Sequence, residues 1–444
     1  MNAPICDFVK KYRASSPLRL HMPGHKGNTH IGAEPLDITE IDGADVLYSA
    51  NGIIAESQQN ATTLFDTAKT LYSCEGSSLV IRAMLYLAKL CAPAESNTIL
   101  ASRNAHKTFI SAAALLGLDV EWLYDEKANG ILTCSITPDV LRARLKAMSE
   151  KPAAFYITSP DYLGNIADIR SLSQVCREEN ILFICDNAHG AYLAFTEKNA
   201  HPISSGADMC CDSAHKTLPV LTGGAYLHIS KNAPLSIAEN AQRAMSLFAS
   251  TSPSYLILQS LDSTNAYISD GYTQRLRKCI ENGNRLKQRL TAHGYTVCGD
   301  EPLKLTVAPK SYGYTGTELS EYLAEGNIIC EFCDPDYTVL MFNPENNEAA
   351  FDIIEKSLTS LPKRKPVNKA APHLEIPKRI ISPRAAIFSQ SEIVPVKEAV
   401  GRVLASETVS CPPAIPVVVC GEEINESAVK LFEYYGIKNV TVIK

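Results

Sequence analysis

The sequence predicts an α/β fold with a mostly parallel sheet and helices on both of its faces. Short apolar runs alternate with helical patterns between about residues 60 and 230. The runs lack strict alternation of apolar and polar residues, which is typical of strands covered on both faces, and they lie at 97–102, 153–158, 181–186 and 207–212. Strands that alternate with helices over this length favour parallel pairing through crossover connections.

The helical patterns have recognisable starts and faces. Residues 79–91 are apolar nearly all round, so they predict a buried helix. Thr137 and Pro138 predict a helix start, because a threonine hydroxyl caps the first turn and proline is tolerated there. Residues 253–292 predict a long helical segment that is broken near Gly271.

The chain is long enough for several folding units. A segment with four prolines and a basic cluster, 362–377, predicts a linker or a strapping segment. The expected division is an N-terminal arm (1–35), a large domain (36–270), a small α/β domain (271–361), this linker, and a C-terminal lobe (378–444).

Composition excludes several classes of partner. The chain has 42 Lys and Arg against 48 Asp and Glu, and its net charge of −6 gives no electrostatic reason to expect nucleic acid or an anionic membrane. No apolar run approaches the ~18 residues of a spanning helix, and the first residues lack a signal-peptide core. We therefore expect a cytoplasmic protein with reduced thiols. Cys330 and Cys333 have no second cysteine pair, so no metal site is expected.

Polar residues follow three of the predicted strands. Asp186 ends one strand and is followed by Ala188 and His189, Lys216 follows a second strand, and His106 follows a third. Ligands of open α/β sheets bind beyond the carboxyl ends of the strands. We therefore expect these groups to converge on one edge of the sheet.

Lys216 and Asp186 together suggest pyridoxal phosphate. A lysine that is desolvated after a buried strand must pair or lose its proton, and its amine can then form a Schiff base with an aldehyde. An acid such as Asp186 can keep a pyridine nitrogen protonated, and His106 can stack on a planar ring. Taken singly, the same residues also fit a surface lysine, a helix cap and an ordinary loop histidine.

A phosphate needs a cradle of donors. Gly76, Ser77 and Ser78 directly precede the predicted buried helix, whose N-terminus carries partial positive charge. Ser213, three residues before Lys216, is a further donor candidate. A Gly-Ser-Ser sequence can also be a plain helix cap.

Several motifs together resemble the Orn/Lys/Arg decarboxylases, a fold-type-I, aspartate-aminotransferase-like group of pyridoxal phosphate enzymes. The resemblance covers nearly the whole chain and rests on LHMPGHKGN (20–28), DITEIDGADVL (37–47), DNAHGAYLAF (186–195), SAHKTLPVLTGGAYLH (213–228), STSPSYLILQSLD (250–262) and EAVGRVLASETVSCPPAIPVVVCGE (398–422). It implies a large domain with a mostly parallel seven-stranded sheet and smaller α/β C-terminal lobes.

The resemblance also implies residue roles. Lys216 would form the Schiff base, Asp186 would hold the pyridinium, and His106 would stack on the ring. His215 would lie over the cofactor, and it or Lys216 would protonate the product carbon. The remaining cofactor contacts would come from Gly76, Ser77, Ser78, Ser213, Ala188 and His189.

The length resembles short Gram-positive members, which lack an N-terminal response-regulator-like domain. The resemblance therefore implies a homodimer with shared active sites, or a tetramer, in which 250–255 approaches the neighbouring subunit's phosphate. Glu75, Arg82 and Asp161 depart from the family pattern, as does CPP at 411–413, and these changes bear on substrate specificity.

The expected reaction is decarboxylation of arginine, lysine or ornithine to the amine and carbon dioxide. A basic substrate needs an acidic partner. Glu331, expected to face inward from a strand at 327–334, is the first candidate, and Asp45 is the second.

Three alternatives stay open on the sequence. The fold could catalyse another pyridoxal phosphate reaction, as an aminotransferase or aldolase does. It could be a non-catalytic protein. It could instead be a metal hydrolase built on His106, Asp186, His189 and His215, which would leave Lys216 unexplained.

Overall fold

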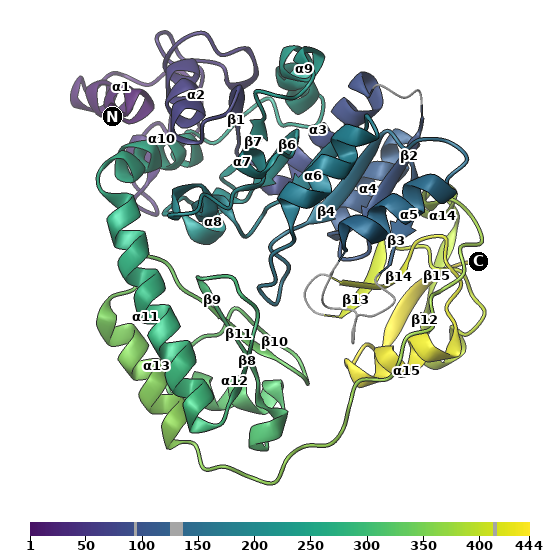
Figure 1. The fold of residues 1–444 in the computed structure, drawn as a ribbon. Coiled ribbons are helices and arrows are strands. Elements are labelled where there is room, and N and C mark those ends of the chain that lie inside the picture. Colours follow the sequence, from purple (N-terminus) through teal and green to yellow (C-terminus); the bar gives the residue numbers. More distant parts are fainter. Residues whose placement is uncertain (93–95, 125–135, 412–414) are drawn as a thin grey trace. The chain divides into compact units, whose positions relative to one another are not determined.

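The computed structural model describes residues 1–92, 96–124, 136–411 and 415–444 (Figure 1). The chain forms two compact units, each made of separate stretches. The first comprises Met1–Glu95, Ala153–Phe155 and Ile169–Arg275, and the second comprises Ser96–Pro152, Tyr156–Asp168 and Leu276–Lys444. Within the described ranges, no helix is both long and apolar enough to cross a membrane.

A seven-stranded sheet has the order β1-β7-β6-β5-β4-β2-β3. Its strands are β1 (Lys69–Ser73), β2 (Thr98–Ser102), β3 (Asp119–Leu123), β4 (Ala154–Thr158), β5 (Leu182–Asp186), β6 (Met209–Asp212) and β7 (Ala225–Ile229). Strands β5 and β6 pair in parallel, as do β2 and β3, whereas β7 is antiparallel to both of its neighbours. The four strands predicted from apolar runs, and the α/β class itself, are confirmed.

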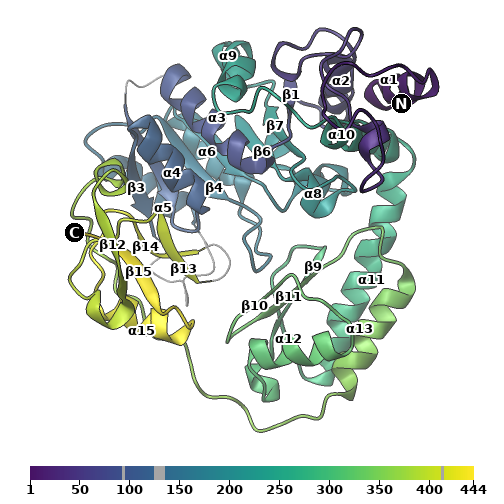
Figure 2. The same ribbon diagram turned by 180° about the vertical axis from the view of Figure 1, so that it is seen from behind.

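The helices of the first unit surround the strands that end at the candidate site. They are α1 (Pro4–Ala14), α2 (Ile53–Leu64), α3 (Gly76–Cys91), α6 (Ile169–Glu178), α7 (Pro202–Ser205), α8 (Ala214–Thr217), α9 (Leu235–Ser246) and α10 (Tyr255–Ser269). Helix α3 is buried over most of its length, as its apolar sequence predicts, and it packs against β1, β5, β6 and β7. In Figures 1 and 2, α3 and α6 lie along the strands of the sheet, whereas α1 lies beside α2 and α10.

The second unit contains a smaller antiparallel sheet with the order β10-β11-β9-β8. Its strands are β8 (Thr296–Cys298), β9 (Lys304–Ala308), β10 (Phe332–Cys333) and β11 (Thr338–Met341). The helices of this unit include α4 (Lys107–Leu116), α5 (Pro138–Ala147), α12 (Gly316–Glu325), α13 (Glu348–Ser360) and α14 (Pro383–Ile387). The predicted start of α5 is confirmed, because the Thr137 hydroxyl accepts a hydrogen bond from the Val140 amide.

A long helix, α11 (Tyr272–His293), follows α10 after the break predicted at Gly271. Gly271 has a φ of +70°, in the left-handed region that glycine adopts without a Cβ clash, so the helical run is interrupted there. In Figures 1 and 2, α11 and α13 lie side by side along the small sheet. Residues 362–377, predicted to be a linker or strapping segment, form no helix or strand.

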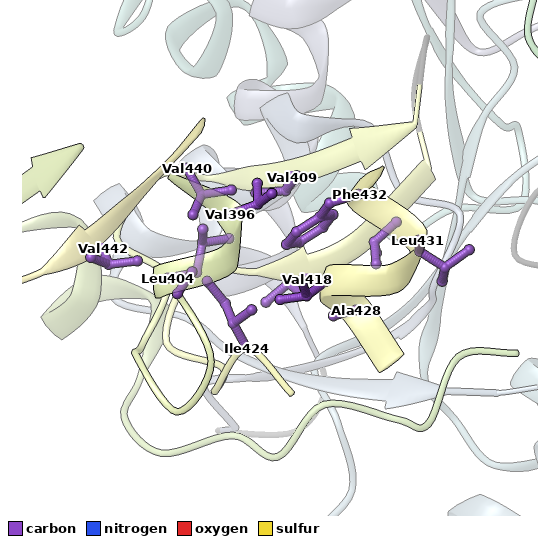
Figure 3. Close-up of a cluster of buried hydrophobic side chains, with 13 residues drawn as sticks. Val396, Leu404, Val409, Val418, Ile424, Ala428, Leu431, Phe432, Val440 and Val442 are labelled. Atoms are coloured by element: carbon purple, nitrogen blue, oxygen red, sulfur yellow. The ribbon is translucent and has the colours of Figure 1, made fainter. Parts of the chain in front are cut away.

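The C-terminal segment has its own hydrophobic core (Figure 3). Its elements are β12 (Ser391–Pro395), β13 (Thr408–Cys411), β14 (Ile415–Val419), α15 (Glu426–Tyr434) and β15 (Asn439–Ile443). Strand β12 pairs with β15, and β13 pairs with β14. One face of α15 supplies Leu431 and Phe432 to this core, opposite Val418 and Val440. Pro412 and Pro413 of the CPP sequence lie outside the described residues.

One predicted strand is wrong in extent. The sequence predicts a strand over 327–334, but only Phe332 and Cys333 form the two-residue β10. Glu331 lies just before it and is exposed, so its side chain does not face the interior as expected. An apolar run does not settle strand length, because pairing with a neighbouring strand decides where the ladder ends.

Candidate active site

Two of the predicted site segments emerge together from the large sheet. Asp186 is the last residue of β5, and Lys216 lies in α8, four residues after β6 ends. The parallel pairing places Asp186 beside Cys211 of β6. The carboxyl ends of β5 and β6 therefore bring the predicted acid and the predicted lysine to the same edge, as expected.

Asp186 is a buried carboxylate with local donors. Its Oδ1 accepts a hydrogen bond from the Ala188 amide at 3.2 Å and from the Cys211 thiol at 3.2 Å. Burial raises the pKa of the Cys211 thiol well above its usual value, so this group stays a neutral donor. These contacts orient the carboxyl group, as is needed for one that must meet a cofactor nitrogen.

Lys216 contacts a histidine of the neighbouring loop. Its Nζ lies 3.1 Å from Nε2 of His189, which is itself buried. Lys216 is exposed in the single chain, so the expectation that it is desolvated after a buried strand is wrong. Its candidacy as the Schiff-base lysine rests on its contact with His189 and on its position at the same sheet edge as Asp186, and not on burial.

His215 directly precedes this lysine and is partly buried. Its Nδ1 lies 3.0 Å from the Gly224 carbonyl oxygen, which can only accept, so Nδ1 carries the proton and donates. Burial lowers the pKa of His215, and the Lys216 charge lowers it further. A neutral imidazole with Nε2 as its acceptor is therefore favoured beside Lys216.

The start of α3 fits a phosphate group. No side chain caps this 16-residue helix, and Gly76 at its first position has a φ of +70° with no atom within 4 Å of the place a Cβ would take. The hydroxyl of Ser213 donates to that of Ser77 at 2.8 Å, so two predicted phosphate donors meet there. With Ser78 in the first turn, these groups suit a dianion at a helix N-terminus.

The structure accounts for two departures from the family pattern. The Glu75 carboxylate accepts the Ser250 amide at 2.6 Å, so it is engaged by the backbone of another segment. Asp161 is buried and accepts both the backbone amide and the side-chain amide of Asn165, at 2.8 and 2.7 Å. Both acids have structural partners.

His106 lies in the second unit, at the N-cap of α4 beyond β2. Its Nδ1 accepts the Thr108 amide at 3.2 Å, which leaves the proton on Nε2. The residue follows the carboxyl end of its strand as predicted. Its stacking on a cofactor ring stays a prediction.

The two candidate substrate carboxylates differ in their surroundings. Glu331 is exposed and accepts the Tyr162 hydroxyl at 2.8 Å. Asp45 is buried, and its oxygens accept five backbone amides, those of Val46, Asn51, Gly52, Ile54 and Ala55. Burial raises the pKa of Asp45, but these amides outweigh it and lower the pKa overall. Asp45 thus holds the start of α2.

Sequence reasoning missed two buried polar groups. Asp212 contacts two histidines and an asparagine within the first unit. In the second unit, Arg103 forms a bidentate ion pair with Glu422. No sequence motif marks either group. The consecutive polar residues at the end of β6 could have pointed to Asp212, whereas nothing comparable points to the Arg103–Glu422 pair.

Comparison with known families decides the identity of the fold. The model of the Orn/Lys/Arg decarboxylase major domain matches residues 3–307, and that of the C-terminal domain matches residues 370–440. The chain belongs to the Orn/Lys/Arg decarboxylase family. It is therefore a pyridoxal phosphate-dependent amino-acid decarboxylase, as the sequence motifs predicted.

Curated relatives of this decarboxylase match along nearly its whole length. The arginine decarboxylase of Bacillus subtilis (strain 168) is 27% identical, over 98% of this chain and 93% of the relative. The arginine decarboxylase of Halalkalibacterium halodurans is 29% identical, over 96% of this chain and 91% of the relative.

Solved structures show the same fold. The lysine decarboxylase of Francisella novicida has a TM-score of 0.81 and 16% identity, covering 100% of this chain and 81% of that one. Lysine decarboxylase A of Pseudomonas aeruginosa also has a TM-score of 0.81 and 16% identity, covering 99% and 80%. The fold-type-I assignment is confirmed. The family assignment overturns the metal-hydrolase, aminotransferase, aldolase and non-catalytic alternatives.

Proposed function

We propose that this decarboxylase acts on arginine and releases agmatine and carbon dioxide. The observation that carries the proposal is that relatives matched over nearly the whole chain are named arginine decarboxylases. The solved lysine decarboxylases are only 16% identical and bear on the fold alone. Arginine is therefore favoured over lysine and ornithine.

The residues at the ends of β5 and β6 fit the reactive part of pyridoxal phosphate. When bound, this cofactor supplies an electron-accepting ring that takes up the electrons of the Cα–carboxylate bond. The Lys216 amine would hold the aldehyde carbon, and the Asp186 carboxylate would hold the ring nitrogen. Ala188 and His189 would line the same part of the cofactor site, since Ala188 contacts Asp186 and His189 contacts Lys216.

The phosphate would lie at the start of α3. Gly76 offers open space, and Ser77, Ser78 and Ser213 offer hydroxyl donors beside an uncapped helix N-terminus. His106 would stack on the ring from the loop after β2. This last contact rests on the family resemblance.

Proton delivery to the substrate Cα would come from His215 or Lys216. Nδ1 of His215 is fixed by the Gly224 carbonyl, so Nε2 is the atom that would exchange a proton. A neutral imidazole can take up a proton and return it. The lowered pKa of His215 keeps its imidazole neutral near neutral pH, so it would have to take up a proton before it could deliver one.

Glu331 is our first candidate for the substrate guanidinium. Its exposed carboxylate is oriented by the Tyr162 hydroxyl and retains acceptor capacity for a bidentate arginine contact. Asp45 is the weaker candidate, because five backbone amides already occupy its oxygens.

We further propose a homodimer with shared active sites. Large apolar side chains of the N-terminal arm are strongly exposed in the single chain, at Leu18, Leu20, Met22 and Ile31. Ser250–Ser252, predicted to approach a neighbouring subunit, are exposed as well. Light scattering should give twice the chain mass of 48.3 kDa. A cytoplasmic location stays a prediction.

The substrate is tested with purified protein and pyridoxal phosphate. Each of arginine, lysine and ornithine is supplied, and the amine is identified by mass spectrometry. Agmatine should dominate, whereas cadaverine or putrescine as the main product would contradict the proposal. Lys216→Ala should abolish turnover and borohydride trapping of the cofactor, while Lys231→Ala, an exposed lysine paired with Asp66, should leave both unchanged.

Glu331 is tested by its isosteric variant. Glu331→Gln removes a charge, so KM for arginine should rise about tenfold or more, since a charge-assisted contact contributes about 1.5–3 kcal/mol. Pyridoxal phosphate affinity should not change. Glu321→Gln, on the exposed side of α12, is the control. An unchanged KM for Glu331→Gln would remove it from the substrate site.

A further inference from the structure

A buried carboxylate joins four segments around the candidate site. Asp212 ends β6 and is fully buried. Its Oδ2 lies 3.0 Å from Nε2 of His201 and 3.2 Å from Nε2 of His228. Its Oδ1 accepts the side-chain amide of Asn187 at 2.6 Å. Both histidines are also fully buried, so water does not compete for these contacts.

The three partners come from different parts of the first unit. Asn187 follows Asp186 at the end of β5, His201 precedes α7, and His228 belongs to β7. Nδ1 of His228 in turn lies 2.9 Å from the Thr70 hydroxyl on β1. Asp212 itself lies four residues before Lys216. One side chain thus links the Asp186 turn to the lysine segment.

The charge state of this cluster follows from its donors and acceptors. An ionised carboxylate only accepts, so each histidine must carry its proton on Nε2. His228 Nδ1 is then free to accept from the Thr70 hydroxyl. Burial alone raises the pKa of Asp212, but the two histidines outweigh it and hold the pKa well below its usual value. The Asp212 carboxylate is therefore ionised and accepts from three donors.

Asn187 has little freedom to leave this arrangement. Its backbone amide donates to the Cys211 carbonyl at 3.0 Å, and its carbonyl accepts from Gly190 at 2.8 Å. A Cβ added to Gly190 would lie 2.0 Å from Asn187 Oδ1, so the side chain is packed tightly against the turn. Fixing the Asn187 amide therefore fixes the turn that carries Asp186.

We propose that Asp212 is a positioning residue that sets the Asp186–Gly190 turn relative to Lys216 before the cofactor binds. The inference rests on the cofactor roles proposed above for Asp186 and Lys216. Preorganisation lowers the cost of ordering these groups on binding, so its loss should appear as weaker cofactor affinity.

The same cluster also has the composition of a metal site. His201, Cys210 and Asp212 present ligand atoms within 4.8 Å of one another. Hydrogen bonds from the imidazoles to the carboxylate already explain the short distances. Cys210 Sγ is 3.9 Å from His201 Nε2, and burial raises the pKa of this thiol well above its usual value, so without a metal ion it stays neutral. We therefore favour the positioning role, and metal content becomes part of the test.

The test variant is Asp212→Asn, which keeps the shape and removes the charge. An amide group offers one acceptor and one donor end, so it cannot accept from both histidines and also from the Asn187 amide in its present orientation. Binding of pyridoxal phosphate to the apoprotein, followed by protein fluorescence, should weaken at least about tenfold, which is about 1.4 kcal/mol. The absorbance of the bound cofactor should also shift.

The matched control is Asp262→Asn. Asp262 is equally buried and accepts the Cys6 amide at 2.9 Å and the Ser57 hydroxyl at 2.6 Å, so it anchors α1 rather than the site. Both variants should lower the apoprotein melting temperature, but only Asp212→Asn should weaken cofactor binding. Equal cofactor affinity in wild type and Asp212→Asn would overturn the proposal.

A double-mutant cycle separates positioning from general destabilisation. Asn187→Ala alone should weaken cofactor binding. In the double variant with Asp212→Asn, it should weaken binding by less than about a further threefold, because the two side chains act together. Independent, additive effects would refute the coupling. Metal analysis that finds one zinc ion per wild-type chain and none in Asp212→Asn would overturn the positioning role in favour of metal binding. Failure of borohydride to label wild-type Lys216 would instead refute the proposed function.

Discussion

The ion pair between Arg103 and Glu422 offers a sharp stability prediction. Arg103 directly follows β2, and Glu422 lies in the C-terminal segment, 319 residues away. The two guanidinium NH2 groups lie 2.7 Å from the two carboxylate oxygens. Their side chains are only 12% and 3% exposed. The perturbation is Glu422→Gln, which keeps the shape and removes the negative charge.

The expected cost follows from what the substitution leaves behind. Arg103 would keep its hydrogen bonds to the Pro416 and Val417 carbonyls and its cation–π contact with the Trp122 ring. Its positive charge, however, would no longer be paired with a negative one. Breaking a buried pair in this way costs about 3–5 kcal/mol. Glutamine retains one acceptor oxygen, so we expect the lower end, about 3 kcal/mol. Solvent screening reduces this little at such low exposure.

The assay is hydrogen exchange read by mass spectrometry on peptides from 378–411 and 415–444. A loss of about 3 kcal/mol raises the open population of this segment more than a hundredfold. The control is Asp119→Asn, which breaks the exposed pair between Arg379 and Asp119, whose side chains are 40% and 55% exposed. An exposed pair contributes about 0–1 kcal/mol, so exchange should barely change.

Two outcomes would refute this reasoning. One is an exchange rate in Glu422→Gln equal to that of the Asp119→Asn control. The other concerns the double variant Arg103→Met with Glu422→Met, which removes both charges and should be less destabilised than Glu422→Gln alone. A double variant as unstable as the sum of the single variants would show that the charge pair is not the source of the effect.

The remaining predictions concern pH and packing. Burial raises the pKa of Asp208 to about 6, so the folded state binds more protons than the unfolded state, and stability falls as pH rises from about 4 to about 6. Asp208→Asn should remove about 2 kcal/mol of that dependence, measured as urea midpoints across this range. Gly316→Ala would place a Cβ 2.2 Å from the Tyr337 carbonyl oxygen, and it should lower stability by about 1–3 kcal/mol in thermal unfolding.

Much of the large domain was predictable because its signals are local. The runs that became β2, β4, β5 and β6 are short and apolar, and the cap at Thr137 and the break at Gly271 depend on single residues. The motif containing Lys216 was predictable for the same reason, since its residues are adjacent in sequence. The prediction that Glu331 faces inward is wrong, because strand length and side-chain exposure depend on the partner strand.

The sequence by itself determined the α/β class, the strand ends at which Asp186 and Lys216 emerge, and the family. Only the tertiary structure decided which buried charges meet. Nothing in the spacing of His201, Asp212 and His228 marks one carboxylate as the acceptor for both imidazoles, and nothing near Arg103 points to Glu422. Periodicity and capping act over a few residues, whereas the partner of a buried charge is set by how distant segments pack.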